Sequence, residues 1–235
     1  MNIIAFDLWS YYAHFKKPYT TTSPLTYSFP TRTAISGVIG ALIGIDKDNY
    51  METFNKKNSF IGLSIKNPVK KIRMGQNLID TKKSMNIIHV RTQIKIEYLK
   101  NPCYRIYVCH NNDKVHDNIK SNLLNHSSVF TISLGLSGNI ANFKYIGEYE
   151  CEFIYNEKEF VEIDSIIPLD KVRKGGVDFT IEGEYFTEKI PIEMNKDRLV
   201  TQYGEMLFER TGKKIKTKPS DYILIKELNE KVCFI

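Results

Sequence analysis

The chain has 235 residues, of which 26% are charged and 12% aromatic, and its formal net charge is +6. This length can bury one sizeable core, or a main domain with a smaller second piece, and the aromatic content excludes a disordered chain. The charge is uneven, because residues 1–120 hold 18 Lys and Arg against 8 Asp and Glu, whereas residues 121–235 hold 15 against 19. A basic first half attracts polyanions, but an unevenly charged, solvated surface gives the same count.

Several classes of site and location lack their sequence signals. The four cysteines form no CxxC pair and have no histidines at zinc-finger spacing, so we expect free thiols in a reducing cytoplasm. Asp7 interrupts the first apolar stretch, which therefore does not resemble a signal peptide. The apolar run 34–45 is shorter than the roughly 20 residues that span a bilayer. Carboxylates at metal-ligand spacing and a GxxxxGK[ST] phosphate loop are also missing, so we expect no metal and no cofactor.

Residues 2–9 are apolar and rich in β-formers, which predicts a buried strand. The following loop, 10–29, is long and carries aromatic side chains interleaved with His14, Lys16 and Lys17. Aromatic rings offer stacking faces and lysines pair with phosphates, which is the combination that single-stranded RNA needs. The alternative is that the aromatic residues only anchor the loop to the core.

A helix is predicted from Pro30 to Gly44, with Thr31 or Thr33 as its N-terminal cap. Small residues recur along one face of this helix at spacings of three or four, and they include Gly37. Such a face suits close approach of another backbone, or plain packing of the helix on a sheet. At the N-terminal end, Arg32 and nearby hydroxyls next to the helix dipole would seat a phosphate.

The next elements follow in an order that indicates a fold class. We predict a partly helical link at 46–57, strands at 59–67, 103–109 and 143–154, a helix at 113–125 and a glycine-rich turn at 133–138. Residues 70–100, which include Lys82 and Lys83, read as a long hairpin outside the main sheet. The order strand–helix–strand–strand–helix–strand predicts an α+β fold of the ferredoxin-like, RNA-recognition-like type over residues 1–157.

Residues 158–235 change character and are predicted to form a β-rich C-terminal extension. We expect a hairpin over 177–194 that turns near 186–187, a strand or short helix at 199–209, and a terminal hairpin made from 222–228 and 231–235. Because this half is acidic, we expect it to face protein rather than RNA.

Residues 15–44 read FKKPYTTTSPLTYSFPTRTAISGVIGALIG, a long and specific motif. This run closely resembles the CRISPR-associated protein 5 family of the RAMP superfamily, and most of all the version in type I-B Cascade complexes. The resemblance is strongest over residues 1–44, with supporting traces to about residue 147. It implies an antiviral-defence subunit that binds the 5′ handle of the CRISPR RNA, caps the backbone subunit filament and docks the large PAM-reading subunit near target DNA. By analogy with related subunits, hairpin 70–100 is a thumb that folds over RNA.

From this resemblance and the charge pattern we expect RNA contacts from twelve side chains. They are His14, Lys16, Lys17, Tyr27, Thr31, Arg32, Thr33, Lys70, Lys71, Arg73, Arg91 and Ser137.

Two rival functions stay open. One is a metal-independent endoribonuclease that processes precursor CRISPR RNA, as in type I-C relatives, with His14 as base and Lys16 or Lys17 as the cation. The other is a globular domain with no RNA role. Because type I-B systems use a separate cutting subunit, the resemblance implies that this chain is not an enzyme.

Overall fold

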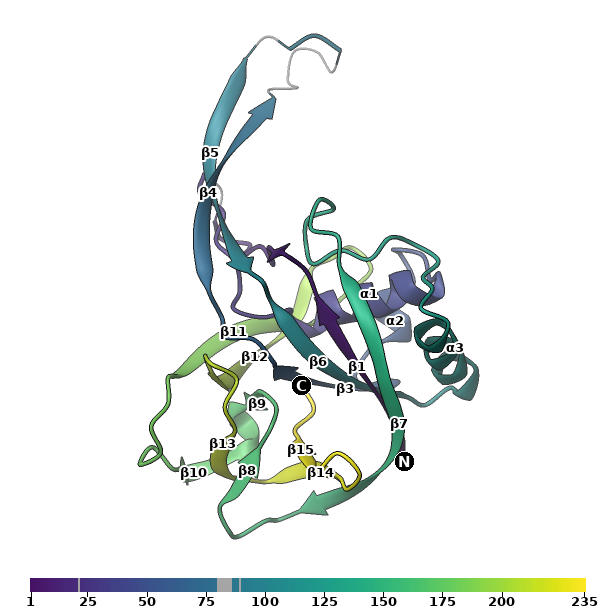
Figure 1. The fold of residues 1–235 in the computed structure, drawn as a ribbon, viewed down its shortest axis with the longest axis vertical. Helices are drawn as coiled ribbons and strands as arrows, with labels where there is room; N and C mark the ends of the chain where they lie inside the picture. The colour runs from purple at the N-terminus through teal and green to yellow at the C-terminus, as the bar shows by residue number, and fades with distance from the viewer. Residues whose placement is uncertain (21, 80–85, 89) are drawn as a thin grey trace.

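The computed structural model describes residues 1–20, 22–79, 86–88 and 90–235. Its central unit is an antiparallel sheet with strand order β7-β1-β6-β3, and α1 and α3 pack on one face (Figure 1). The chain order strand–helix–strand–strand–helix–strand makes this unit ferredoxin-like, which confirms the predicted α+β fold class. The bounds are β1 (Asn2–Trp9), α1 (Arg32–Ile43), β3 (Ser59–Ile65), β6 (Cys103–His110), α3 (Asp113–Leu124) and β7 (Asn142–Tyr155).

Helix α1 begins and ends where the sequence predicts. The Ala34 amide donates to the Thr31 hydroxyl at 3.2 Å, so Thr31 is the N-terminal cap. Gly44 ends the helix in the left-handed region (φ 79°), which side chains rarely adopt. The buried side of α1 includes Ile35 and Ile39, which join the main core beneath the sheet. Each fully buried side chain of this size contributes about 1.5–3 kcal/mol. The core under this face therefore holds α1 firmly in place.

The predicted thumb is a long hairpin of β4 (Lys71–Ile79) and β5 (Arg91–Lys100), with the short β2 (Tyr12–Ala13) added beside β5. It projects from the body of the protein (Figure 1). Residues 80–85 and 89, and with them Lys82 and Lys83, lie outside the described residues. The hairpin over 70–100 is confirmed for the strands that the structure describes.

The C-terminal strands complete the main sheet. β14 (Asp221–Ile225) pairs with β7, and β15 (Glu230–Val232) pairs with β14, so the terminal hairpin is confirmed. The chain then returns to β3, where the Ile235 amide donates to the Ile61 carbonyl at 2.9 Å and Phe234 bridges to Gly62. The sheet is therefore curled, and the residues that follow β15 at one edge contact β3 at the other edge. Residues 158–235 are β-rich, as expected, and their end covers the face of the sheet opposite the helices.

One predicted hairpin is wrong. Residues 186–187 lie inside β11 (Tyr185–Met194), which pairs with β12 (Val200–Glu209), and the turn falls at 195–199 instead. Phe186 stacks on Phe208 of β12 (ring centroids 5.8 Å apart), so its position is fixed by cross-strand packing. The turn uses polar residues, and Arg198 takes a positive φ of 60° there. Residues 199–209, predicted as a strand or short helix, are almost entirely strand.

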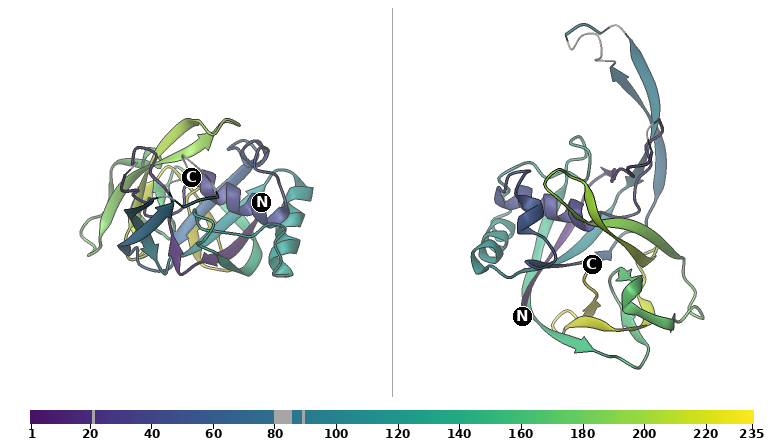
Figure 2. Two further views of the ribbon diagram at one scale, coloured as in Figure 1. Left: turned by 90° about the horizontal axis from the view of Figure 1, so that it is seen from above. Right: turned by 180° about the vertical axis from the view of Figure 1, so that it is seen from behind.

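The remaining elements are short. Two small sheets flank the curled end of the main sheet, one of order β11-β12-β9 and one of order β10-β13-β8. Figure 2 shows the β11–β12 hairpin running beside α1. In the part of the chain that is described, no helix is both long and apolar enough to cross a membrane. The bounds are α2 (Tyr50–Thr53), β8 (Val161–Ile163), β9 (Ile167–Pro168), η1 (Leu169–Lys171), β10 (Val172–Val177) and β13 (Ile215–Pro219).

Candidate nucleic-acid interface

Two adjoining hollows follow the outward side of α1, and together we call them the α1 groove. The larger one, of about 340 Å³, lies between the N-terminal end of α1, the glycine-rich loop and the β11–β12 hairpin. The smaller one, of about 240 Å³, continues along the small residues of the helix. They share Phe15, Thr33, Ala34, Tyr50 and Gly135. Segments from four distant parts of the sequence therefore meet at one surface.

The loop that precedes α1 is ordered by pairing with itself. The Lys17 amide donates to the Leu25 carbonyl at 2.9 Å, and the Tyr27 amide donates to the Phe15 carbonyl at 2.8 Å. The loop is also fixed to the glycine-rich loop, because the His14 amide donates to the Leu134 carbonyl at 3.1 Å. A Cβ atom at Gly135 would lie 1.8 Å from the His14 carbonyl oxygen, so this close approach requires glycine.

Two glycines on the small-residue face of α1, Gly37 and Gly40, have different neighbours. Gly40 packs against Tyr50 of α2, and a Cβ at Gly40 would lie 2.9 Å from the Tyr50 Cβ. Gly37 instead lines the α1 groove, where a Cβ would lie 3.6 Å from the Tyr50 ring, an ordinary contact. The close approach of another backbone, one of the two options that the sequence left open, is therefore not what the glycines serve. They make room for a tyrosine side chain and for the groove.

Five of the predicted RNA-binding residues line this groove: His14, Lys16, Tyr27, Thr31 and Thr33. Lys16 is exposed at its edge, and so is Arg198, which the β11–β12 turn supplies. Among the described residues, no carboxylate lines either hollow. A surface with two exposed cations, the half-buried ring of Tyr50 and no opposing acid attracts a polyanion and offers one aromatic face to a base, whereas Tyr27 is 2% exposed.

The two tyrosines of the groove are neutral phenols. Burial, with smaller contributions from nearby Tyr19, Tyr203 and Glu188, raises the pKa of Tyr27 to about 12. Burial also raises the pKa of Tyr50, and the positive charge of Arg198 partly opposes this shift. Both rings therefore stay uncharged and cannot repel a phosphate at physiological pH.

Lys17 and Arg32 lie elsewhere. Lys17 is paired with Glu188 (Nζ–Oε1 2.5 Å), which also accepts from the Ser28 amide at 2.7 Å. Burial alone would lower the pKa of Lys17, but the bond and charge of Glu188 raise it. Arg32 is 2% exposed and its guanidinium donates to the Phe54 carbonyl and to Ser59, at 2.8–3.0 Å. Arg32 thus links α1 to the start of β3 and does not line the α1 groove.

Arg32 borders a separate cavity of about 320 Å³. Three carboxylates, those of Asp48, Glu52 and Glu193, line this cavity with Arg32 and Lys196. Burial lowers the pKa of Arg32 to about 10, and nearby Glu193 acts in the opposite direction. With three acids around it, this cavity suits a polyanion less well than the α1 groove does.

Three basic residues of the described thumb strands share one face with Glu97. Arg73 pairs with Glu97, and Arg91 pairs with Ile79 six positions further along β4, so both arginines point to the same side. Lys95, between them on β5, shares that side. Lys71 at the base donates to the Thr26 carbonyl at 3.2 Å, while Lys70 and Arg91 are exposed. Ser137 is exposed on the glycine-rich loop, next to Leu136 of the groove.

Sequence reasoning missed Tyr50 and Arg198. Tyr50 lies within the polar link 46–57 and carries no signal of its own. Arg198 lies in the polar run 195–198 between two β-rich segments, which is a turn signal that could have placed the hairpin correctly.

The His14 side chain is buried and makes contacts within the protein. Its Nδ1 lies 2.7 Å from the Glu97 carbonyl oxygen, its ring lies 5.7 Å from that of Tyr98, and it is 2% exposed. Within the described residues, no cluster of three or more His, Cys, Asp or Glu side chains could hold a metal ion.

Comparison with known proteins gives a family. A family model described as CRISPR-associated protein (Cas_Cas5) matches residues 3–189. A CRISPR protein from Archaeoglobus fulgidus is 13% identical over 99% of this chain and 98% of its own, with a TM-score of 0.62. A chain of a CRISPR RNA-guided surveillance complex is 10% identical over 91% of both chains, with a TM-score of 0.55. No match to a curated protein was found. Because the family model covers most of the sequence, the chain belongs to the CRISPR-associated protein 5 family.

Proposed function

We propose that the protein is a non-catalytic subunit of a type I CRISPR effector complex, most like type I-B, and that its α1 groove holds the 5′ handle of the CRISPR RNA. The observation that carries this proposal is the composition of the groove. Lys16, Arg198 and the half-buried, neutral ring of Tyr50 converge there without a carboxylate among the described lining residues. Phosphate contacts position a nucleic acid and aromatic faces accept its bases.

The family membership and the likeness of the fold to a chain from a CRISPR RNA-guided surveillance complex support a place in such an assembly. In this proposal the basic face of the thumb, with Arg73, Arg91 and Lys95, folds over the RNA that leaves the groove. The acidic C-terminal half faces the backbone subunits and the large PAM-reading subunit, close to target DNA. In such complexes base pairing reads the target and the protein supplies shape and backbone contacts.

The environment of His14 supports a binding role rather than catalysis. A general base must reach the 2′-hydroxyl whose proton it removes. One ring nitrogen of His14 is occupied by the Glu97 carbonyl, and the side chain is almost fully buried. Its position suits a residue that fixes the RNA-binding loop to the base of the thumb.

The test is the salt dependence of RNA binding. We expect the double variant Lys16→Ala, Arg198→Ala to bind repeat RNA more weakly and to reduce the slope of log K against log salt by about 0.7 for each lost phosphate contact. Lys114→Ala, which removes an exposed lysine from α3, is the matched control and keeps the wild-type slope. Unchanged affinity and slope in the double variant would exclude the α1 groove as the RNA site.

A further inference from the structure

A further cavity, of about 540 Å³, opens where the main sheet ends near the base of the thumb. Trp9 is the last residue of β1 and pairs with Cys103 of β6 and with Asn142 of β7. Directly paired residues of antiparallel strands point to the same face, so these three side chains share one side of the sheet. All three line this cavity, which we call the Trp9 pocket.

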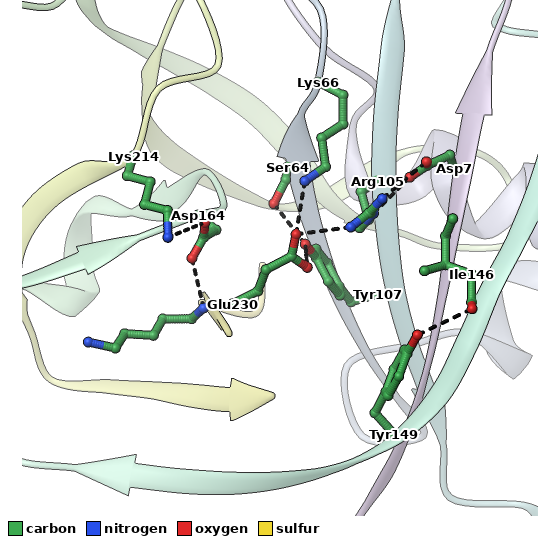
Figure 3. A network of polar contacts seen from close by, with 11 residues as sticks. Asp7, Ser64, Lys66, Arg105, Tyr107, Ile146, Tyr149, Asp164, Lys214 and Glu230 are labelled. Atoms are coloured by element: carbon green, nitrogen blue, oxygen red, sulfur yellow. Dashed lines mark hydrogen bonds and ion pairs between the residues drawn. The ribbon is translucent and has the colours of Figure 1, made fainter. Parts of the chain in front are cut away.

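The C-terminal strands leave this end of the face uncovered. Two residues before Trp9, Asp7 accepts a hydrogen bond from Arg105, whose guanidinium also donates to Glu230 of β15 (Figure 3). Farther along β1, Ile3 and Ala5 pack against the C-terminal strands. The C-terminal strands therefore cover this face of β1 only as far as Asp7. In RNA-recognition domains an open sheet face is the surface on which bases stack.

The lining of the Trp9 pocket has the chemistry that recognises a nucleobase. Tyr11 is 83% exposed at its rim, beside the half-exposed Trp9. Two carboxamides present unused groups: Asn67 donates through Nδ2 to the Asn101 carbonyl, and Asn142 accepts through Oδ1 from the Phe143 amide. The Oδ1 of Asn67 and the amino group of Asn142 are then an acceptor and a donor for a base edge. No carboxylate of the described residues lines this pocket.

The Trp9 pocket and the α1 groove are lined by neighbouring residues of the same two chain segments. The chain from Ser10 to His14 runs beside the glycine-rich loop, with the Ser10 hydroxyl bonded to the Ile140 carbonyl (2.8 Å) and the His14 amide bonded to Leu134. Ile140 lines the pocket, and Leu136 lines the groove. The three residues from Tyr11 to His14 span at most about 10 Å when extended. A single strand held in the groove therefore reaches the pocket within a short distance.

We propose that the Trp9 pocket receives one unstacked base of the single-stranded RNA that the α1 groove holds. This inference rests on the proposed function and adds a base-binding site to it. The base stacks against Tyr11 and Trp9, and the free amide groups of Asn67 and Asn142 face its edge.

Trp9 makes the proposal directly measurable, because it is the only tryptophan in the chain. We expect short oligoadenylate and oligouridylate to quench tryptophan fluorescence, with a saturation that coincides with binding measured by gel shift. Tyr11→Ala should weaken binding roughly tenfold, which is the effect of losing one stacked base. The matched control is Tyr155→Ala, because Tyr155 is 65% exposed at the other end of β7.

The outcomes separate the pocket from the groove. If the oligonucleotides bind by gel shift while Trp9 fluorescence and the affinity of Tyr11→Ala stay unchanged, the pocket proposal is wrong and the groove proposal stands. If neither oligonucleotide nor repeat RNA binds, both are wrong. A fluorescence response to another subunit of the complex, with none to RNA, would assign the pocket to a protein contact and overturn the inference.

Discussion

At the scale of single residues, Arg32 shows how a motif arginine is used inside the fold. Its side chain is buried, and its three hydrogen bonds go to Phe54 and Ser59. These bonds close the connection between α1 and β3. The cationic character of the groove comes from Lys16 and Arg198 instead.

We expect Arg32→Ala to lower the free energy of unfolding by roughly 1.5–3 kcal/mol, because charged hydrogen bonds are lost and buried carbonyls lose their donor. Urea unfolding measures this change, and Arg198→Ala, which removes an exposed arginine, should leave stability unaltered. Arg32→Ala should not change the salt slope of RNA binding. Normal stability together with a reduced salt slope of RNA binding in Arg32→Ala would show instead that Arg32 contacts RNA.

His14 carries the second prediction at this scale. We expect the purified protein to bind repeat RNA and leave it intact, both in EDTA and in Mg²⁺. His14→Asn keeps an amide N–H near the position of Nδ1 that can donate to the Glu97 carbonyl, so it should affect RNA affinity at most. Denaturing gels of the incubated RNA provide the measurement. Cleavage at one position that His14→Asn abolishes, with RNA binding retained, would establish the endoribonuclease function instead.

At the scale of elements, two glycines on one face of helix α1 have different roles. Gly40 leaves room for the Tyr50 side chain of α2 to pack against the helix, whereas Gly37 lines the α1 groove. Both positions cost helix propensity, since glycine in a helix interior is less stable than alanine by roughly 0.5–1 kcal/mol.

The two glycines should therefore respond oppositely to the same substitution. Gly37→Ala adds an ordinary contact with Tyr50 and should stabilise the protein by roughly 0.5–1 kcal/mol. Gly40→Ala places a methyl group 2.9 Å from the Tyr50 Cβ and should destabilise it, because the neighbouring helix must shift. Thermal or urea unfolding of the pair decides the matter. Equal effects of the two substitutions would contradict this division of the helix face.

At the scale of the whole molecule, the curled sheet is fastened by a polar network. Glu230 accepts hydrogen bonds from Lys66, Arg105 and Tyr107 at 2.7–3.0 Å, so β15 is tied to β3 and β6 (Figure 3). Burial alone would raise the pKa of Glu230, but the bonds from Tyr107 and Lys66 and the charge of Arg105 lower it below its usual value. The network favours the carboxylate and fixes the C-terminal end of the chain.

A depressed pKa in the folded state gives a defined pH dependence. The stabilisation by Glu230 is complete above the pKa of the unfolded chain, about 4.3, and is lost as pH falls through the lower folded value. We expect Glu230→Gln to lower the free energy of unfolding at neutral pH by roughly 1–3 kcal/mol. Its deficit against the wild type should shrink as the pH falls below about 4. A deficit that is the same at neutral and acid pH would show that the lost charge is not the cause.

The ferredoxin-like core can be predicted from the amino-acid sequence, because its signals are local. The apolar, β-rich stretch 2–9 predicts β1, and the Thr31 cap and the Gly44 stop place α1 almost to the residue. The motif at 15–44 likewise indicates the family that the later comparison shows.

Which side chains share a surface depends on contacts between distant parts of the chain. Arg32 and Thr33 are adjacent in sequence, yet consecutive residues of a helix point in different directions. The Arg32 side chain therefore lies in the interior, and Thr33 lines the groove. Arg198 lines the same groove as Lys16 only because β11 and β12 pair in a register that places their turn at 195–199, where the sequence alone predicts a different hairpin. The C-terminal strands meet β3 through bonds between residues more than 150 positions apart, such as Lys66–Glu230 with a separation of 164. Local propensity carries no information about such contacts, because they form only when the whole sheet has curled and buried the apolar face between its ends.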